Sequence, residues 1–139
     1  MKTTTAELLE ELQNIKDIQS FFNAHEKDFL KINPVDYLNS LLNSKNVTVA
    51  DIIKKSNSGE YLYKVFSGER KASRDVIISI AFGLSMSVDE LQLLLRISKF
   101  AVLDSRDKRD SIIIYSLSHN LSSMETNNLL YENNAVTLF

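Results

Sequence analysis

The chain has 139 residues, 44% of them hydrophobic, and a formal net charge of −2 at pH 7. It contains no cysteine, which excludes disulfides and thiolate metal sites, and its three glycines and one proline are too few for the tight turns of an all-β fold. We therefore expect a globular, all-α, cytoplasmic protein. No apolar run is long enough to span a bilayer, so we expect no membrane partner.

The first segment, residues 1–33, is expected to hold one amphipathic helix over residues 5–22, followed by a short link over residues 25–32. Apolar residues recur there at spacings of one, three and four, and acidic residues with Lys16 and Asp17 fill the opposite face. This apolar stripe either packs on the rest of the chain or forms a dimerisation seam between two copies.

The second segment, residues 34–98, shows five helix patterns in succession. The first opens at Asn33-Pro34, with asparagine as the cap and proline at the first helical position. The fourth begins at Ser73, and the fifth begins at the capping box Ser87-Val-Asp-Glu90.

The second and third of these patterns, between residues 47 and 73, are two short helices joined by a tight turn. Thr48 and Asp51 form the capping box of the first helix, which stops at Ser56-Asn57-Ser58 because these side chains compete with helical backbone bonds. Ser58 is expected to cap the next helix, and Gly68 is expected to end it. Such a short helix, presented on its neighbour and followed by cations, has the shape to lie in a nucleic-acid groove.

The third segment, residues 99–139, repeats the helix pair that precedes it. A shift of 35 residues places Asp75 on Asp110 and Ser87 on Ser122. We therefore expect helices over residues 111–118 and 123–131, stacked on the preceding pair. This second pair either only extends the core or also binds a partner through its outer face.

Charge is distributed unevenly along the chain. Residues 41–75 hold seven Lys and Arg against four Asp and Glu, whereas residues 1–40 hold four against seven and residues 76–139 hold five against seven. The net basic stretch therefore coincides with the two short helices, where contact with a polyanion would need it.

The order of signals from Tyr37 to Leu95 resembles the Cro/C1-type (XRE-like) helix-turn-helix family of bacterial and phage regulators. The matching runs are Tyr37-Leu-Asn-Ser-Leu-Leu42, Thr48-Val-Ala-Asp-Ile-Ile-Lys-Lys55, Ser58-Gly-Glu-Tyr-Leu-Tyr-Lys-Val-Phe-Ser-Gly-Glu-Arg-Lys-Ala-Ser73 and Leu84-Ser-Met-Ser-Val-Asp-Glu-Leu91. The whole chain is similar to a Firmicutes-type subgroup with a tail like Lys108–Ile114 and Glu125–Leu130.

This resemblance implies a fold with three parts. They are an N-terminal amphipathic helix in residues 1–33, a five-helix lambda-repressor-like helix-turn-helix core in residues 34–98, and a C-terminal helix-pair extension in residues 99–139. The three parts are expected to form a single domain.

The resemblance also implies a transcriptional regulator that binds double-stranded DNA as a homodimer, with the helix after Ser58 in the major groove. Two leading base-reading positions fall on Gly59 and Glu60, and a phosphate-contacting position falls on Val49, so base reading is weakened more than phosphate binding. About four phosphate contacts give log affinity a slope of roughly −3 to −4 against log salt. The candidate DNA-binding residues are Lys54, Lys55, Ser58, Glu60, Tyr63, Lys64, Arg70, Lys71 and Arg74.

The alternative function is a protein-interaction module that keeps the helix-turn-helix scaffold but binds DNA weakly or not at all. It would act as an adaptor or inhibitor toward a protein partner, for instance in phage or mobile-element biology. The acidic composition together with Gly59, Glu60 and Val49 favours this alternative.

An enzyme is not expected. No set of carboxylates or cysteines at ligand spacing accompanies either histidine, His25 or His119, and three glycines could hardly build a phosphate-binding loop. We therefore expect neither catalysis nor a cofactor nor a metal.

Overall fold

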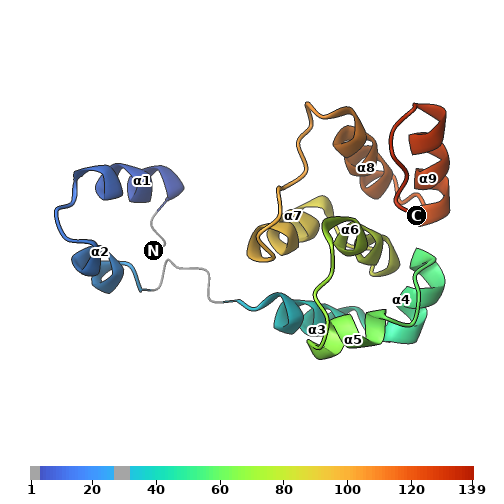
Figure 1. Cartoon of the computed structure of the whole chain (residues 1–139), viewed down its shortest axis with the longest axis horizontal. Coiled ribbons are helices and arrows are strands. Elements are labelled where there is room, and N and C mark those ends of the chain that lie inside the picture. Colours follow the sequence, from blue (N-terminus) through green and yellow to red (C-terminus); the bar gives the residue numbers. More distant parts are fainter. Residues whose placement is uncertain (1–3, 27–31) are drawn as a thin grey trace. The chain divides into compact units, whose positions relative to one another are not determined.

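The computed structural model describes residues 4–26 and 32–139, which form nine α-helices and no strand (Figure 1). The all-α prediction is confirmed. The chain divides into two compact units, Met1–Lys31 and Ile32–Phe139. The C-terminal helix pair belongs to the same unit as the helices of residues 34–98.

The N-terminal unit contains two helices, α1 (Thr5–Asn14) and α2 (Ile18–Ala24). The prediction of one continuous helix over residues 5–22 is therefore wrong. The backbone becomes extended at Ile15, and Asp17 starts a new helix because its carboxylate accepts from the amide of Gln19 at 3.2 Å. Its bond with the Ser20 hydroxyl, at 2.8 Å, holds the pKa of Asp17 below its ordinary value.

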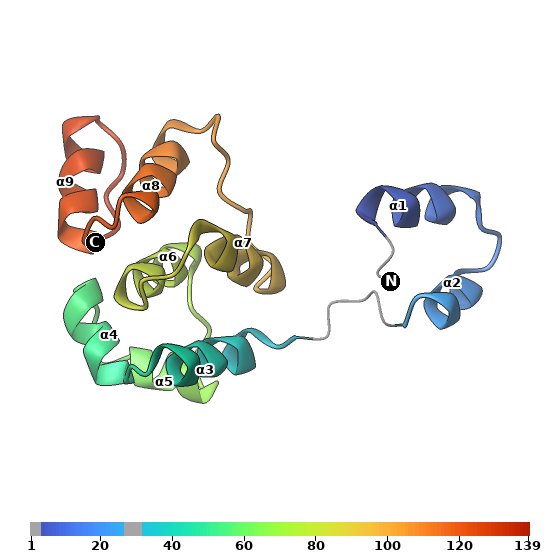
Figure 2. The ribbon, with the colours of Figure 1, turned by 180° about the vertical axis from the view of Figure 1, so that it is seen from behind.

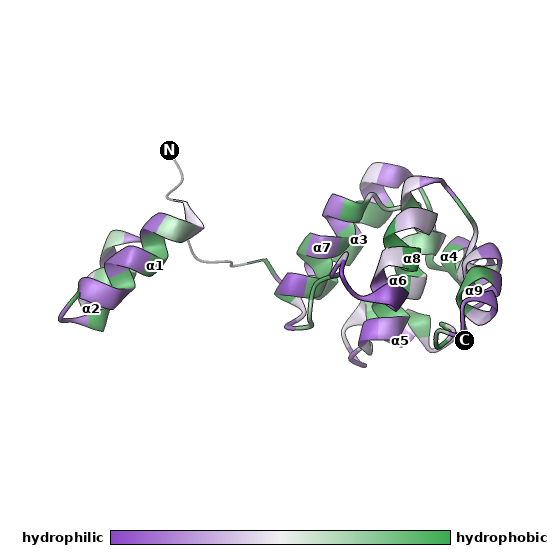
Figure 3. Cartoon of the chain, turned by 90° about the horizontal axis from the view of Figure 1, so that it is seen from above, coloured by the Kyte–Doolittle hydropathy of each residue, from purple (hydrophilic) through white to green (hydrophobic). Residues whose placement is uncertain are grey.

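Hydrophobic and hydrophilic residues alternate along both helices of this unit (Figure 3). Phe21 is buried, whereas Leu9 and Leu12 on α1 remain 57% and 40% exposed. The part of the expected link that covers residues 27–31 lies outside the described residues.

The second unit contains seven helices in its described residues, and Figures 1 and 2 show their arrangement from opposite sides. They are α3 (Pro34–Lys45), α4 (Val49–Ser56), α5 (Leu62–Ser67), α6 (Arg74–Gly83), α7 (Val88–Ile97), α8 (Lys108–Ser118) and α9 (Ser123–Glu132).

Side-chain caps set most of these starts. The capping box of Thr48 and Asp51 on α4 and the Ser87 box on α7 are both present, and the Ser122 box on α9 repeats the latter. Helix α8 begins at Lys108, before the predicted residue 111, because Asp107 caps it by accepting from an amide of its first turn.

Helix α6 lies at the centre of the unit, in contact with α4, α7 and α9. Its residues Ile78, Ile80 and Ala81 are fully buried. Helix α4 approaches it closely at Gly83, where an added Cβ would lie 2.7 Å from Ile52 Cγ2 and 3.1 Å from the Ile52 carbonyl oxygen. A residue without a side chain therefore sets the α4–α6 distance.

The pair α8–α9 repeats the geometry of α6–α7. The turn between the helices has a left-handed residue at Ser85 in the first pair and at Asn120 in the second, 35 positions on. The segment after the second helix likewise has left-handed Lys99 and Asn134. The contacts repeat as well, because α6 meets α9 and α8 meets α7. The two pairs therefore face each other as a pseudo-two-fold arrangement.

Candidate nucleic-acid interface

The candidate interface is built on α4, the turn after it and α5. Helix α4 ends at Ser56, and Asn57 takes a left-handed conformation with φ 55°. Asparagine tolerates this conformation because its short polar side chain can bond locally. The chain then reverses, and α5 packs against α4 and against α3.

The predicted cap at Ser58 is wrong. Helix α5 begins at Leu62, and no side chain caps it. The Ser58 hydroxyl instead lies 2.7 Å from the Ser56 hydroxyl, which donates to the Ile52 carbonyl at 2.6 Å. The Ser56 hydroxyl donates its single proton to the Ile52 carbonyl, so the Ser58 hydroxyl is the donor in this pair. The Ser58 side chain therefore points back toward α4.

Gly59 and Glu60 consequently lie in the turn and not on the helix. Backbone bonds of the tighter i→i+3 type lead into α5, from the Tyr63 amide to the Glu60 carbonyl and from the Lys64 amide to the Tyr61 carbonyl, each 3.0 Å long. The positions that the resemblance assigns to base reading therefore precede the helix.

Helix α5 buries one face and exposes the other. Leu62, Val65 and Phe66 are buried, whereas Tyr63 is 51% exposed and Lys64 is exposed as well. Gly68 ends the helix with φ 86°, as the sequence predicts.

Asn39 of α3 fixes the far end of α5. Its side-chain amide donates to the Phe66 carbonyl and to the Val35 carbonyl, at 2.9 Å each. The last turn of α5 is thereby tied to α3 by a bond that the sequence alone does not predict, because the two partners lie 27 residues apart.

Five of the predicted cations are exposed to solvent. Within residues 4–26 and 32–139, none of them forms an ion pair with a carboxylate. They lie on the last turn of α4, on α5 and on the segment that follows α5, and they are Lys54, Lys55, Lys64, Arg70 and Lys71.

Arg70 has an aromatic neighbour that the sequence analysis missed. Its guanidinium carbon lies 5.5 Å from the centre of the Tyr61 ring, within the range of a cation–π contact. Its amide also donates to the Lys64 carbonyl at 3.2 Å. These two bonds keep the start of the 69–73 segment beside α5.

Arg74 is placed differently from the other predicted cations. Its guanidinium donates to both carboxylate oxygens of Asp110, at 3.0 and 3.3 Å, and to the backbone carbonyls of Ala101 and Val102. Its donors therefore serve the contact between the two helix pairs and not the surface formed by α4 and α5.

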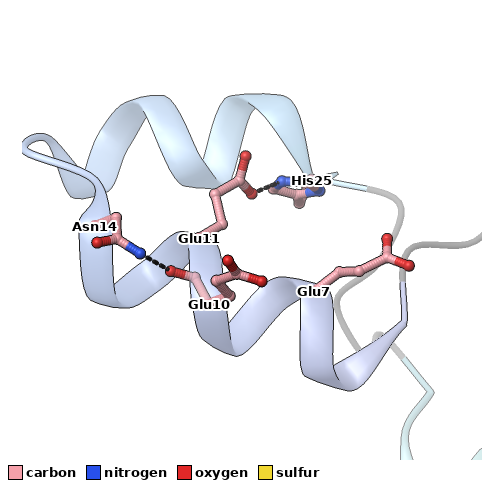
Figure 4. A pocket seen from close by; sticks show the side chains of 5 residues that line it. All are labelled: Glu7, Glu10, Glu11, Asn14 and His25. Atoms are coloured by element: carbon pink, nitrogen blue, oxygen red, sulfur yellow. Dashed lines mark hydrogen bonds and ion pairs between the residues drawn. The ribbon is translucent and has the colours of Figure 1, made fainter.

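A separate hollow lies within the N-terminal unit and is lined by acidic residues (Figure 4). Glu11 pairs with His25 across it, and the Asn14 side chain donates to the Glu10 carbonyl at 2.8 Å. No group of three or more potential metal ligands occurs among the residues that the structure describes. In the same residues, no helix has the length and apolar character needed to cross a bilayer.

No family model, curated protein or solved structure matches the chain.

Proposed function

We propose that this protein is a DNA-binding transcriptional regulator whose α4 and α5 form a helix-turn-helix, within a lambda-repressor-like core of α3 to α7. The observation that carries the proposal is the set of five exposed cations on and after these helices that form no ion pair with a described carboxylate. The resemblance of residues 37–95 to the XRE-like family supports the same function.

In this proposal α5 enters the major groove with Tyr63 and Lys64 toward the bases. Lysine can donate to guanine, and a tyrosine ring can contact a thymine methyl group. Lys54 and Lys55 on one side, with Arg70 and Lys71 on the other, contact phosphates and set the orientation of the helix.

Recognition by one copy is weak in this arrangement. Gly59 has no side chain, and Glu60 can only accept, from a cytosine amino group, while it repels phosphates. A single good bidentate base contact contributes about 1–3 kcal/mol, so selection of a site requires two copies of α5 on a two-fold DNA site.

The test measures binding to mixed-sequence duplex DNA at two salt concentrations by fluorescence anisotropy. We expect affinity to fall steeply with salt and the triple variant Lys64→Ala/Arg70→Ala/Lys71→Ala to lose most of it. The matched control is Arg96→Ala/Lys99→Ala/Arg106→Ala, which removes the same charge from exposed positions elsewhere. Equal loss in both triple variants, or no binding at low salt, refutes the proposal.

A second candidate is a protein-interaction module on the same scaffold. The observation that favours it is the exposed Glu60 beside Gly59 in the turn, where a DNA reader would present donors. Absence of DNA binding at low salt, together with a folded protein, is the outcome that favours this candidate.

A further inference from the structure

The outer face of the second helix pair carries a groove of about 340 Å³ between α8 and α9. It is lined by Ser111, Ile112, Tyr115, Leu129 and Asn133. Tyr115 is 52% exposed, and Ile112 and Leu129 are only half-buried.

The internal repeat shows what happens to this face in the first pair. The positions equivalent to Ile112, Tyr115 and Leu129, 35 residues earlier, are fully or almost fully buried: Ile77 is 3% exposed, and Ile80 and Leu94 are 0% exposed. In the first pair α4 packs on α6 and α3 packs on α7. The same face of the second pair lacks such a cover among the described helices.

Two residue differences between the helix pairs change what can cover this face of α8 and α9. Tyr115 stands at the position of Ile80, and its ring stacks on His119 at 4.0 Å between centres. Ser118 stands at the position of Gly83, so a helix cannot approach α8 as closely as α4 approaches α6. This face of α8 and α9 therefore fits a partner that packs on the Tyr115 ring and stays further from the backbone of α8 than α4 is from that of α6.

The charges beside the groove are self-complementary. Lys108 lies one helical turn before Ile112 on α8, and Glu132 lies one turn after Leu129 on α9. Both are exposed, and neither forms an ion pair with a described residue. A two-fold axis along the groove lays α8 of one copy over α9 of the other and brings each lysine opposite a glutamate.

We propose that the α8–α9 groove is the contact surface of a symmetric homodimer, filled by the same groove of a second copy. Tyr115, Ile112 and Leu129 form its apolar centre, and the Lys108–Glu132 pairs flank it. The inference deepens the proposed function, and its role in placing two α5 helices on DNA rests on that function. It also assigns dimerisation to α8–α9 and not to the stripe of α1.

The test is sedimentation equilibrium of the full chain without DNA, from about 5 to about 200 µM, where contacts of modest area associate. We expect the mass to rise from that of the 15.8 kDa chain toward twice that value. Tyr115→Lys should weaken association about tenfold or more, because it places two like charges at the centre of the contact. Circular dichroism checks that the variant is folded.

A charge exchange supplies the sharper control. Lys108→Glu alone and Glu132→Lys alone should each weaken the dimer, and the double variant should restore it. Leu12→Lys on α1 should leave association unchanged. A monomer throughout the range, a dimer indifferent to Tyr115→Lys and both single charge variants, or loss through Leu12→Lys overturns the inference.

The two proposals fail separately. A monomer that still binds duplex DNA through Lys64, Arg70 and Lys71 overturns only the dimer contact. A dimer that responds to the α8–α9 variants but shows no salt-dependent DNA binding overturns only the regulatory function.

Discussion

Arg74 and Arg109 occupy equivalent positions in the two helix pairs, and each donates to the aspartate that follows the other. Arg74 Nη2 lies 3.0 Å from Asp110 Oδ2, and Arg109 Nη1 lies 2.9 Å from Asp75 Oδ1. The crossing follows from the pseudo-two-fold relation, because the pairs face each other with the starts of α6 and α8 together.

Each arginine also binds the backbone of the segment that ends its own pair. Arg109 donates to the carbonyls of Val136 and Thr137, 35 positions after the carbonyls of Ala101 and Val102 that accept from Arg74. Arginine suits this position because its planar fork offers five donors in a fixed geometry.

Replacing Arg74 with alanine should destabilise the protein by about 2–4 kcal/mol, because it leaves the carboxylate of Asp110 without its cation. Asp110 is 6% exposed, which makes an unpaired charge expensive there. Arg109→Ala is the matched variant, and it should destabilise less because the side chain of its partner Asp75 is 41% exposed. Urea unfolding of both variants gives the comparison, and an equal effect contradicts the explanation.

Arg74→Ala also separates structure from the proposed DNA binding. Because its guanidinium is engaged with Asp110, its removal should not change the salt dependence of DNA binding in the folded variant. A smaller slope of log affinity against log salt would indicate that Arg74 also contacts a phosphate.

Gly83→Ala should destabilise the protein by about 1–3 kcal/mol, since the new methyl group meets Ile52 from α4 and the backbone must shift. The clash includes the Ile52 carbonyl at 3.1 Å, which cannot rotate away. Ser118→Ala at the equivalent, exposed position of α8 should change stability by less than about 0.5 kcal/mol. Thermal unfolding followed by circular dichroism measures both, and a neutral Gly83→Ala contradicts the predicted close approach.

Asn39→Asp should loosen the end of α5 and destabilise the protein by about 1–3 kcal/mol, because a carboxylate oxygen then faces the carbonyls of Val35 and Phe66. Asn39→Ala, which only removes the donor, should destabilise less. Hydrogen exchange of the α5 amides measures the local effect. Unchanged protection in Asn39→Asp would show that the Asn39 side chain does not hold the end of α5.

The capping box of α4 should make the free energy of unfolding of the protein depend on pH in the acid range. The bond from the Thr48 backbone amide lowers the pKa of the Asp51 carboxyl below the ordinary value of 3.8. A group whose pKa is lower in the folded state contributes stability above its unfolded pKa, and loses it as pH falls through the folded value. Asp51→Asn should therefore destabilise at pH 7 and have little effect well below pH 3.8, as measured by urea unfolding at the two extremes.

Lys64→Ala should reduce the slope of log affinity against log salt by about one, as expected for loss of one phosphate or base-edge cation. Lys99→Ala, at an exposed position after α7, is the control and should leave the slope unchanged. Filter binding across a salt series gives both slopes. If the control alone changed the slope, the binding surface would have to lie elsewhere.

Local chemistry made much of the fold predictable. Thr48 and Ser87 each precede an acidic residue by three positions, and this spacing specifies a helix start without reference to the rest of the chain. Low glycine and proline content indicated helices throughout, and the 35-residue repeat placed α9. The cap signals depend only on neighbouring residues, whereas the composition and the repeat are properties of the whole sequence.

The errors arose where a local signal had two outcomes or where a distant partner decided. Asp17 and Ser58 both suit a helix cap, yet Asp17 starts a helix that the periodicity did not reveal, and Ser58 bonds to Ser56 instead. The role of Arg74 depends on Asp110, 36 residues away, and nothing near Arg74 in the sequence distinguishes it from Arg70. For the candidate site, the buried face of α5 and its end at Gly68 were predictable, but the start of α5 and the contacts of Arg74 were not.

The crossed ion pairs Arg74–Asp110 and Arg109–Asp75 connect the two helix pairs. They therefore bear on which fragment of this chain can fold alone. A truncation after residue 98 would keep the five helices of the expected core but would strip Arg74 of its acceptors and uncover the inner surfaces of α6 and α7. We therefore expect the compact unit of residues 32–139 to be the smallest part that folds alone, and recombinant fragments for binding studies should retain both helix pairs.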